Sequence, residues 1–271
     1  MPAKILVDNI SKNELESEWG LSVYIEAFDK KILLDTGKSG KFAENARTLG
    51  IDLEKVDYGV LSHAHYDHSD GMEAFFSSNS SAHFYLRETS DENCYHKLIY
   101  PFGRYIGIKK GTLEKYKDRI EYVSGDYMLC EGVFLIPHKT QGLEKIGKKA
   151  KMYVKRGKLL RPDNFSHEQS LVIDSKQGLV IFNSCSHGGA DNIINEVRAT
   201  FPDKKIYAIC GGFHLFMSSE KEIRAFAGRV QETGIEHVIT GHCTGERAYE
   251  ILKEELGEKV SQIYVGMEID F

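Results

Sequence analysis

The chain has 271 residues, of which 41% are hydrophobic, so it can bury the core of one large layered domain or of two closely joined halves. Its formal net charge of -5 argues against nucleic acid or an anionic membrane as the main partner. The start MPAKILVDNI lacks the features of a signal peptide, and no apolar run approaches the roughly 20 residues of a membrane span. Five widely spaced cysteines without C-x-x-C spacing indicate reduced thiols, which favours the cytoplasm; the oligomeric state stays open.

Short apolar segments between turn residues predict strands along the whole chain. In chain order they are 4–7, 21–28, 31–35, 58–62, 82–86, 131–137, 170–174, 178–184, 205–210 and 237–241. Helical periodicity predicts helices over 42–49, 193–201, 219–230 and 248–256, and the third of these begins with a Ser219–Glu222 capping box. Strands follow one another early and alternate with helices late, which predicts an α+β fold with sheets packed face to face and helices outside.

Two segments differ from this pattern. Residues 87–118 lack a clean period but contain several aromatic or imidazole side chains, so we interpret them as a lid or as a poorly patterned pair of helices; these side chains include Tyr95, His96, Tyr100, Phe102 and Tyr105. Residues 139–161 carry nine Lys or Arg against one acidic residue, Glu144. This basic insertion is either a solvated surface or a positively charged collar that attracts an anionic substrate. Both segments are expected within a single domain that spans 1–271.

Four side chains that commonly bind metals follow the strand predicted at 58–62 with H-x-H-x-D-H spacing: His63, His65, Asp67 and His68. Alternate residues of an extended segment face the same way, so His63 and His65 can bind one ion. Asp67 and His68 lie past the strand end and can turn toward a second ion. Imidazole and carboxylate ligands suit zinc, manganese or iron(II), and two ions roughly 3.5–4 Å apart form a known hydrolytic centre. We therefore predict two divalent ions, with zinc favoured.

The same motif resembles a known family. HAHYDHSDG at 63–71 is similar to the H-x-H-x-D-H signature of metallo-β-lactamase-like hydrolases, and LLDTG at 33–37 resembles that fold's earlier aspartate-bearing strand end. Three later motifs resemble the branch of proteins that are similar to dihydropterin-linked ribofuranosylaminobenzene 5'-phosphate synthase: NSCSHGG at 183–189, CGGFHL at 210–215 and TGHCTG at 240–245. The resemblance covers most of the chain and implies a four-layer αββα sandwich with the metals at one edge, between the sheets.

The resemblance also implies the remaining ligands. It assigns His63 and His65 to the first ion, Asp67 and His68 to the second, and His242 as the residue that completes the second. His187 is expected to complete the first ion. Many relatives carry a bridging Asp after the strand at 178–184, where this chain has Asn183-Ser184-Cys185-Ser186-His187. Cys185 is therefore either a thiolate ligand or a small buried residue, and His138 and His167 compete with His187 for the first ion.

These residues predict a metal-dependent hydrolase acting on an anionic small molecule. Asp67 would orient a metal-activated water, and His214 would contact the substrate or its leaving group unless it is a core histidine. The basic insertion favours a phosphodiester or another phosphorylated metabolite, and an ester is the other substrate class. The alternatives are a pterin-linked synthase and a metal-containing binding or regulatory module with little turnover. Cys210 and Cys243 are interpreted as packing residues, and no function is assigned to His83 or His237.

Overall fold

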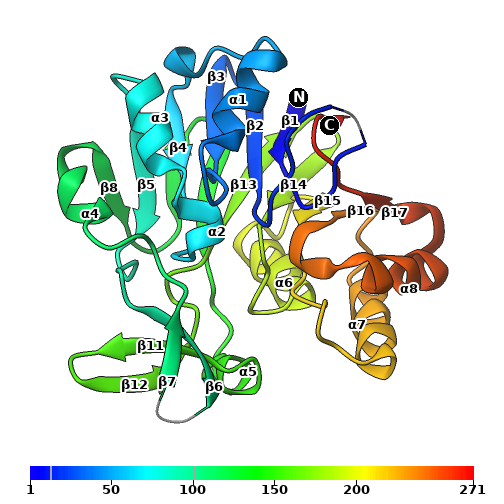
Figure 1. The fold of residues 1–271 in the computed structure, drawn as a ribbon. Helices are drawn as coiled ribbons and strands as arrows, with labels where there is room; N and C mark the ends of the chain where they lie inside the picture. The colour runs from blue at the N-terminus through cyan, green and yellow to red at the C-terminus, as the bar shows by residue number, and fades with distance from the viewer. Residues whose placement is uncertain (13, 100–101) are drawn as a thin grey trace.

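The computed structural model describes residues 1–271 except residues 13, 100 and 101. Two seven-stranded sheets lie face to face, a small third sheet extends from one edge of this sandwich, and the two termini lie side by side (Figure 1). The amino group of Met1 donates a hydrogen bond to Asp270 Oδ1 at 2.7 Å, which ties the first strand to the last. No helix of the described residues is long and apolar enough to cross a membrane.

The first large sheet has the strand order β18-β1-β2-β3-β4-β5-β8. Its strands are β1 Pro2–Val7, β2 Ser22–Ala27, β3 Lys30–Leu34, β4 Tyr58–Val60, β5 His83–Arg87, β8 Ile120–Val123 and β18 Glu268–Asp270. β1, β2 and β3 pair antiparallel, whereas β3, β4, β5 and β8 pair parallel. The parallel strands therefore end at one common edge of the sheet.

The second large sheet repeats this arrangement with the order β17-β16-β15-β14-β13-β10-β9. Its strands are β9 Tyr127–Cys130, β10 Val133–Pro137, β13 Gln169–Ser175, β14 Gly178–Phe182, β15 Ile206–Gly211, β16 His237–Thr240 and β17 Val260–Gln262. β14 through β17 are parallel, and the other pairings are antiparallel. This sheet also has one edge at which several parallel strands end.

Helices cover the outer face of each large sheet. The α-helices are α1 Lys41–Thr48, α2 Tyr66–Ser69, α3 Met72–Ser78, α4 Thr112–Lys115, α5 Glu144–Lys149, α6 Ala190–Thr200, α7 Glu220–Glu232 and α8 Glu246–Leu256. Short 3-10 turns are η1 Leu53–Lys55, η2 Lys117–Arg119, η3 His242–Thr244 and η4 Gly257–Lys259. The predicted capping box is present: the Ser219 hydroxyl accepts from the Glu222 N–H, and the Glu222 carboxylate accepts from the Ser219 N–H.

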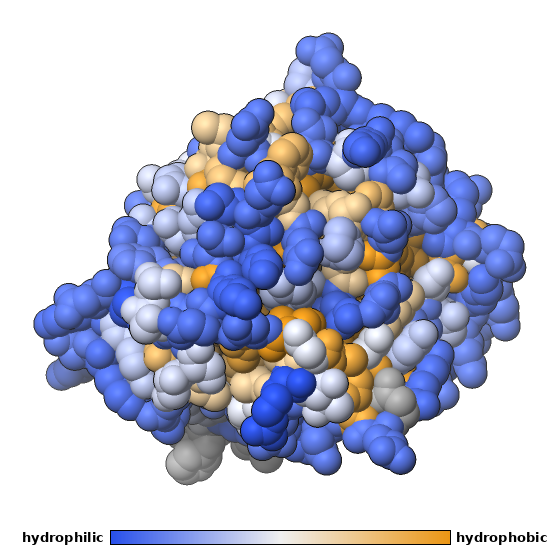
Figure 2. All heavy atoms as spheres, turned by 90° about the horizontal axis from the view of Figure 1, so that it is seen from above, coloured by the Kyte–Doolittle hydropathy of each residue, from blue (hydrophilic) through white to orange (hydrophobic). Residues whose placement is uncertain are grey.

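Three apolar clusters show why these elements stack as four layers. One lies between the sheets and includes Ile25, Leu135 and Phe182. The second joins α6, α7 and α8 to the second sheet, and the third joins α1 and α3 to the first sheet through fully buried rings such as Phe42 and Phe75. Burying each such side chain contributes about 1.5–3 kcal/mol. The predicted α+β, four-layer αββα sandwich is confirmed. From above, its surface is mostly hydrophilic, with hydrophobic residues showing between the polar ones (Figure 2).

The two segments that differ in sequence pattern meet in one four-stranded sheet of order β12-β11-β6-β7. Its strands are β6 Cys94–Ile99, β7 Phe102–Tyr105, β11 Met152–Arg156 and β12 Leu159–Pro162. The interpretation of 87–118 as a pair of helices is wrong, because β6 pairs with β7 and, across more than fifty residues, with β11 of the basic insertion. Tyr100 lies outside the described residues. The small sheet lies below α2 in Figure 1.

Candidate metal centre

The predicted ligands follow strands that end at one edge of the sandwich. In the first sheet, β3 ends just before Asp35 and β4 ends just before residues 61–68. In the second sheet, β14, β15 and β16 end just before 183–187, 212–214 and 241–242. Because parallel strands present their carboxyl ends together, residues far apart in sequence converge there. The loops that carry the sequence motifs are therefore brought into one site.

His63, His65 and His187 form the first cluster. One ring nitrogen of each lies within 4.8 Å of the others, and all three side chains are buried. Nε2 of His63 and Nε2 of His65 are buried without a hydrogen-bond partner among the described residues. A buried polar atom with no partner is costly, so this arrangement fits a bound cation that accepts the two lone pairs. Three ligands also leave a fourth position of a tetrahedral ion open to water or substrate.

Asp67, His68 and His242 form the second cluster. Asp67 Oδ2 lies 3.7 Å from His68 Nε2 and 3.5 Å from His242 Nε2, and the two Nε2 atoms are 3.1 Å apart. Ligand atoms about 2.0–2.2 Å from a tetrahedral zinc ion are separated by roughly 3.3–3.6 Å. The observed spacings are close to this range. The donor atoms of this cluster therefore fit one divalent ion without rearrangement of the backbone.

Four of these histidines are oriented by an oxygen on Nδ1. The partners are Ser62 Oγ for His63 at 2.8 Å, Asp35 Oδ2 for His68 at 2.8 Å, Glu168 Oε2 for His187 at 2.5 Å and Asn9 Oδ1 for His242 at 3.1 Å. Carboxylate and amide oxygens only accept, so the Nδ1 atoms facing them carry the proton. Ser62 donates its hydroxyl proton to Asp35 and therefore accepts from His63. Each Nε2 lone pair is thus free to face the site, as in histidines that bind metals.

The electrostatics keep the first cluster neutral. Burial lowers the pKa of His63 and of His65 well below the usual value, and neighbouring histidines lower it further. Burial alone would raise the pKa of Asp67, but the charge of His68 and the hydrogen bond with His242 outweigh it and hold that pKa below its usual range. Neutral imidazole and ionised carboxylate are the forms that bind a metal ion.

The pKa values of His242 and of two neighbouring cysteines, Cys185 and Cys243, are shifted by one another's charges and by burial. Burial lowers the pKa of His242, but the charges of Cys243 and Asp67 outweigh this and raise it to about 9. Burial raises the pKa of the Cys185 thiol. The hydrogen bond with Cys185 and the charge of His242 lower the pKa of Cys243 against the effect of burial. The protons on this side of the site must leave when a metal binds, so binding there depends on pH.

Backbone strain is concentrated at the site. Of the eight described non-glycine residues with positive φ, five surround the two clusters: Asp35 at 60°, Phe165 at 53°, Ser186 at 47°, His214 at 49° and His242 at 48°. Such conformations cost about 1–3 kcal/mol each and persist where the surroundings enforce them. The Phe165 ring stacks on His187 with centroids 4.9 Å apart and planes within 9°. The turns with positive φ thus orient side chains toward the site, and packing such as that of Phe165 on His187 keeps them in place.

The competing histidines have other partners. His138 places Nδ1 3.1 Å from Glu196 and Nε2 2.9 Å from Glu168, and these carboxylates raise its pKa to about 9 although burial lowers it. His167 accepts the Ala64 N–H on Nδ1 at 3.2 Å and lies 3.0 Å from Asp163 through Nε2. Both ring nitrogens of each are engaged. His167 also belongs to a buried group with His65, Cys94 and Asp163, but the structure groups His187, not His138 or His167, with His63 and His65.

His214 lies at the margin of the first cluster. Its ring centroid is 4.9 Å from that of His187, it is partly buried, and its Nδ1 has no hydrogen-bond partner among the described residues. Cys185 and Cys243 also lie at the site: their sulfurs are 3.4 Å apart, and Cys185 Sγ is 3.3 Å from His68 Nε2. Cys243 is therefore not only a packing residue. Cys210 packs in the core between the sheets, as expected.

Three polar residues around the ligands were not predicted from the sequence. Glu168 holds His187, Asn9 holds His242, and Asp8 accepts the His242 backbone N–H at 2.8 Å. Asp8 and Asn9 directly follow β1, and polar residues after a buried strand are a signal that could have found them. Glu168 follows His167 in sequence and gives no comparable signal. Asp35, noticed only through the family resemblance, accepts hydrogen bonds from Ser62, Ser184 and His68.

An aromatic wall also adjoins the second cluster. The ring centroid of Trp19 lies 5.2 Å from that of His242 and 5.4 Å from that of Phe216. Phe216 and its neighbour Met217 are large hydrophobic side chains that remain 45% and 83% exposed. An apolar surface left exposed beside a polar centre is a common feature of ligand-binding sites. We refer to Trp19 and Phe216 as the aromatic wall, with Met217 beside it.

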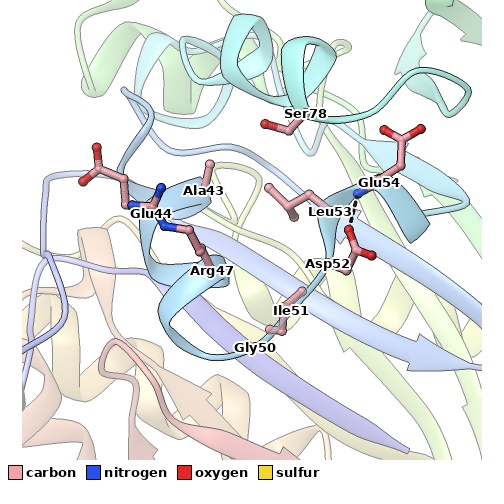
Figure 3. Close-up of a pocket in the computed structure, with 9 residues that line it drawn as sticks. All are labelled: Ala43, Glu44, Arg47, Gly50, Ile51, Asp52, Leu53, Glu54 and Ser78. Atoms are coloured by element: carbon pink, nitrogen blue, oxygen red, sulfur yellow. Dashed lines mark hydrogen bonds between the residues drawn. The ribbon is translucent and has the colours of Figure 1, made fainter.

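One surface pocket lies away from the ligand clusters. It has a volume of about 440 Å³ and is lined by residues of α1, of η1 and of their surroundings, among them Arg47, Asp52 and Glu54 (Figure 3). Asp52 uses its side chain to accept the Glu54 N–H in the cap of η1. The pocket lining includes none of the clustered histidines. The candidate site is therefore identified by its clustered metal-binding side chains and not by the volume of a pocket.

Comparison with known proteins agrees with the geometry. Residues 20–141 match the metallo-beta-lactamase superfamily. The chain is 28% identical, over 94% of its length and 90% of the other protein, to the 7,8-dihydropterin-6-methyl-4-(beta-D-ribofuranosyl)-aminobenzene-5'-phosphate synthase of Methanocaldococcus jannaschii. A diphosphatase of the PhnP family, 14% identical with a TM-score of 0.58 over 100% of this chain and 97% of that one, shares the fold.

A further solved structure is more similar. It is that of Tm1679, a metal-dependent hydrolase of the beta-lactamase superfamily, and it has a TM-score of 0.86 and 34% identity over 100% of this chain and 99% of that one. At 34% identity over nearly all of both chains, the two proteins are similar in sequence as well as in fold. With the αββα sandwich and the H-x-H-x-D-H motif at the ends of its strands, the chain belongs to the metallo-beta-lactamase superfamily.

Proposed function

We propose that the chain is a hydrolase that uses two divalent metal ions, with zinc favoured, to cleave a phosphate-bearing small molecule or an ester. The observation that supports this most directly is the pair of adjacent, buried ligand clusters, His63–His65–His187 and Asp67–His68–His242. The Nε2 atoms of His63 and His65 are buried without partners among the described residues, which is costly, and a bound cation would satisfy both. Belonging to a superfamily that includes metal-dependent hydrolases supports the same proposal.

The chemistry divides between the ions and the chain. Bound divalent ions supply a hydroxide near neutral pH and polarise the oxygen of the scissile carbonyl or phosphoryl group. Asp67 is ionised and accepts a hydrogen bond from the nucleophilic water, which orients it. His214, whose Nδ1 has no hydrogen-bond partner within the described part of the chain, lies at the margin of the site and donates a proton to the leaving group. Its nearness to His187 places it on the side of the first cluster.

The small sheet contributes positive charge beside the site. Burial lowers the pKa of His96 on β6, and the nearby charges of Lys151, His214 and Arg104 lower it further. Lys151 and Arg104 are exposed, and no ion pair joins either to another described residue. These cations therefore remain available to an anionic substrate. Because Lys151 belongs to the basic insertion, its position supports the interpretation of that segment as an electrostatic collar.

Metal analysis and turnover together test the proposal. The purified protein should contain two divalent ions per chain and hydrolyse at least one of p-nitrophenyl phosphodiester, phosphomonoester and ester substrates. Chelation should abolish turnover, and added zinc or manganese should restore it. His65→Ala should lose metal and activity, whereas His83→Ala, on an exposed ring paired with Glu121, should keep both. Full activity of the metal-free protein would contradict the proposal, and two ions with tight ligand binding but no turnover would favour a binding module instead.

The aromatic wall favours a second candidate, a pterin-linked synthase. Trp19 and Phe216 offer flat apolar surfaces on which a planar heterocycle can stack, next to the His242 cluster. The similarity to the M. jannaschii synthase extends over 94% of the chain, which includes these residues. The test is to incubate the protein with a ribofuranosylaminobenzene 5'-phosphate and a dihydropterin whose 6-methyl carbon carries a leaving group such as diphosphate. The amine nitrogen would bond to that carbon as the diphosphate leaves and the nitrogen loses a proton, and mass spectrometry would detect the product. Its formation with turnover would support the synthase over the hydrolase.

A further inference from the structure

The segment 183–187 directly follows β14 at the edge where the ligands converge, and one of its side chains points at both ligand clusters. Cys185 Sγ lies 3.3 Å from His68 Nε2. It forms one group with His63 and His68, and another with His242 and Cys243, in which all ligand atoms lie within 4.8 Å of one another. His63 belongs to the first cluster, whereas His68 and His242 belong to the second. The sulfur is therefore close to donors of both ions.

The other polar side chains of this segment are engaged elsewhere. Asn183 donates to Ser170 Oγ at 3.0 Å and accepts the Ser186 N–H at 2.7 Å. Ser184 donates its hydroxyl proton to Asp35 Oδ2 at 2.5 Å. Ser186 adopts φ 47°, and the hydrogen bond from its N–H to Asn183 closes a tight turn. This turn directs Cys185 and His187, on either side of Ser186, into the site.

Two other acidic or thiol groups nearby fit a bridging position less well. Asp35 Oδ2 already accepts from Ser62, Ser184 and His68, and Oδ1 accepts the Ser62 N–H, so both oxygens are engaged by the surrounding residues. Cys243 is grouped with His242 and Cys185 alone among the described residues, and its sulfur accepts the His214 N–H at 3.2 Å. Cys243 thus contacts the second cluster only. Cys185 is the described side chain outside the two clusters that reaches both.

Charge provides an independent argument. Two divalent ions bring four positive charges into a buried site, and Asp67 is the only acid among the six clustered ligands. An uncompensated charge in a buried site is unfavourable, which is why such sites recruit anionic ligands. A cysteine thiolate carries a single negative charge, as an aspartate carboxylate does. Zinc, cobalt and iron also bind thiolates well.

We propose that Cys185, as a thiolate, bridges the two metal ions of this centre. One proton leaves the thiol when the metals bind, and the sulfur forms a bond to each ion. Cys243, 3.4 Å away, contacts Cys185 as a hydrogen-bonding neighbour and binds neither ion. This inference rests on the proposed binuclear site, but it concerns which residue joins the two ions.

Cobalt titration tests the bridge. The metal-free protein, kept reduced with a phosphine, is titrated with Co²⁺ while the near-ultraviolet thiolate-to-cobalt charge-transfer band is recorded. A bridging sulfur binds both ions, so the band should grow through two equivalents. Saturation after the first equivalent would mean that the sulfur binds one ion only and would overturn the bridge. Binding of two cobalt ions without any band would overturn the inference while leaving the binuclear site intact. Failure to bind cobalt would refute the proposed function itself.

Cysteine variants show which sulfur gives rise to the thiolate-to-cobalt band. Cys185→Ser should abolish the band and weaken binding of at least one cobalt ion by tenfold or more. Cys185→Asp places a carboxylate at this position, so it should bind two ions without the band. Cys243→Ser and the control Cys130→Ser, on the half-buried β9 thiol, should keep both the band and two ions. Persistence of the band in Cys185→Ser, or its loss in Cys243→Ser alone, would overturn the assignment.

Discussion

The carboxylate that holds His187 provides a quantitative test of the first metal site. Glu168 Oε2 lies 2.5 Å from His187 Nδ1, while Oε1 accepts from His138 Nε2 at 2.9 Å and from the His187 N–H at 3.1 Å. In Glu168→Gln one oxygen becomes an amide that can only donate. One of the two histidines then faces a donor in place of an acceptor. We expect zinc affinity to fall about 10–100-fold, as is usual when the outer partner of a ligating histidine is removed, which corresponds to about 1.4–2.7 kcal/mol.

The assay is competition for zinc with a chromophoric chelator at pH 7, and Glu196→Gln is the matched control. Glu196 Oε2 lies 3.1 Å from His138 Nδ1, and Glu196 contacts neither His187 nor any other clustered histidine through a described hydrogen bond. Both variants remove one negative charge beside His138, so both should lower the free energy of unfolding. Only Glu168→Gln should weaken zinc binding. Equal zinc affinity in Glu168→Gln and the unmodified protein would refute the orienting role.

Three further predictions concern stability and turnover. His138 has its pKa raised to about 9 from an ordinary value of 6.5, so its protonation stabilises the fold fully below about pH 6.5, and this contribution is lost as the pH rises through 9. The loss from His138 is about 3 kcal/mol; urea unfolding in chelator at both pH values should show it, and His138→Gln should remove this part of the pH dependence while keeping the part that comes from His242, whose pKa is also raised to about 9. His214→Gln should lower kcat about 10²–10⁴-fold with metal content unchanged; loss of metal would contradict its role at the leaving group. Gly212→Ala would place a Cβ 2.5 Å from the Cys243 sulfur and should destabilise the protein by about 1–3 kcal/mol in urea unfolding, whereas Gly228→Ala, in open space on α7, should stabilise it.

Local patterns predicted the part of the site that one strand end supplies. His63, His65, Asp67 and His68 lie within six residues, so their convergence depends only on β4 and the turn that follows it. Ten of the fourteen strands in the two large sheets and helices α1, α6, α7 and α8 were predicted for a similar reason, because an apolar period of two or 3.6 can be recognised in consecutive residues. The short strands β8, β9, β17 and β18 were not predicted. The layer order was reached through the family resemblance, and the structure confirms it.

Contacts between distant segments could not be predicted in this way. β6 pairs with β11 across more than fifty residues, and neither strand has a clear alternation of apolar and polar residues from which the pairing could be predicted. Glu168 faces His187 only because β13 and β14 are neighbours in the second sheet. The choice of His187 over His138 depended on a motif resemblance. The packing explains the grouping, since Glu168 and Glu196 engage both nitrogens of His138.

The most direct test of two adjacent metal ions is anomalous X-ray diffraction from zinc-loaded crystals, recorded on both sides of the zinc absorption edge. The account predicts two zinc peaks per chain. One should lie among His63, His65 and His187, and the other among Asp67, His68 and His242. A single peak, or a peak held by His138 or by the Asp163–His167 pair in place of His187, would contradict it.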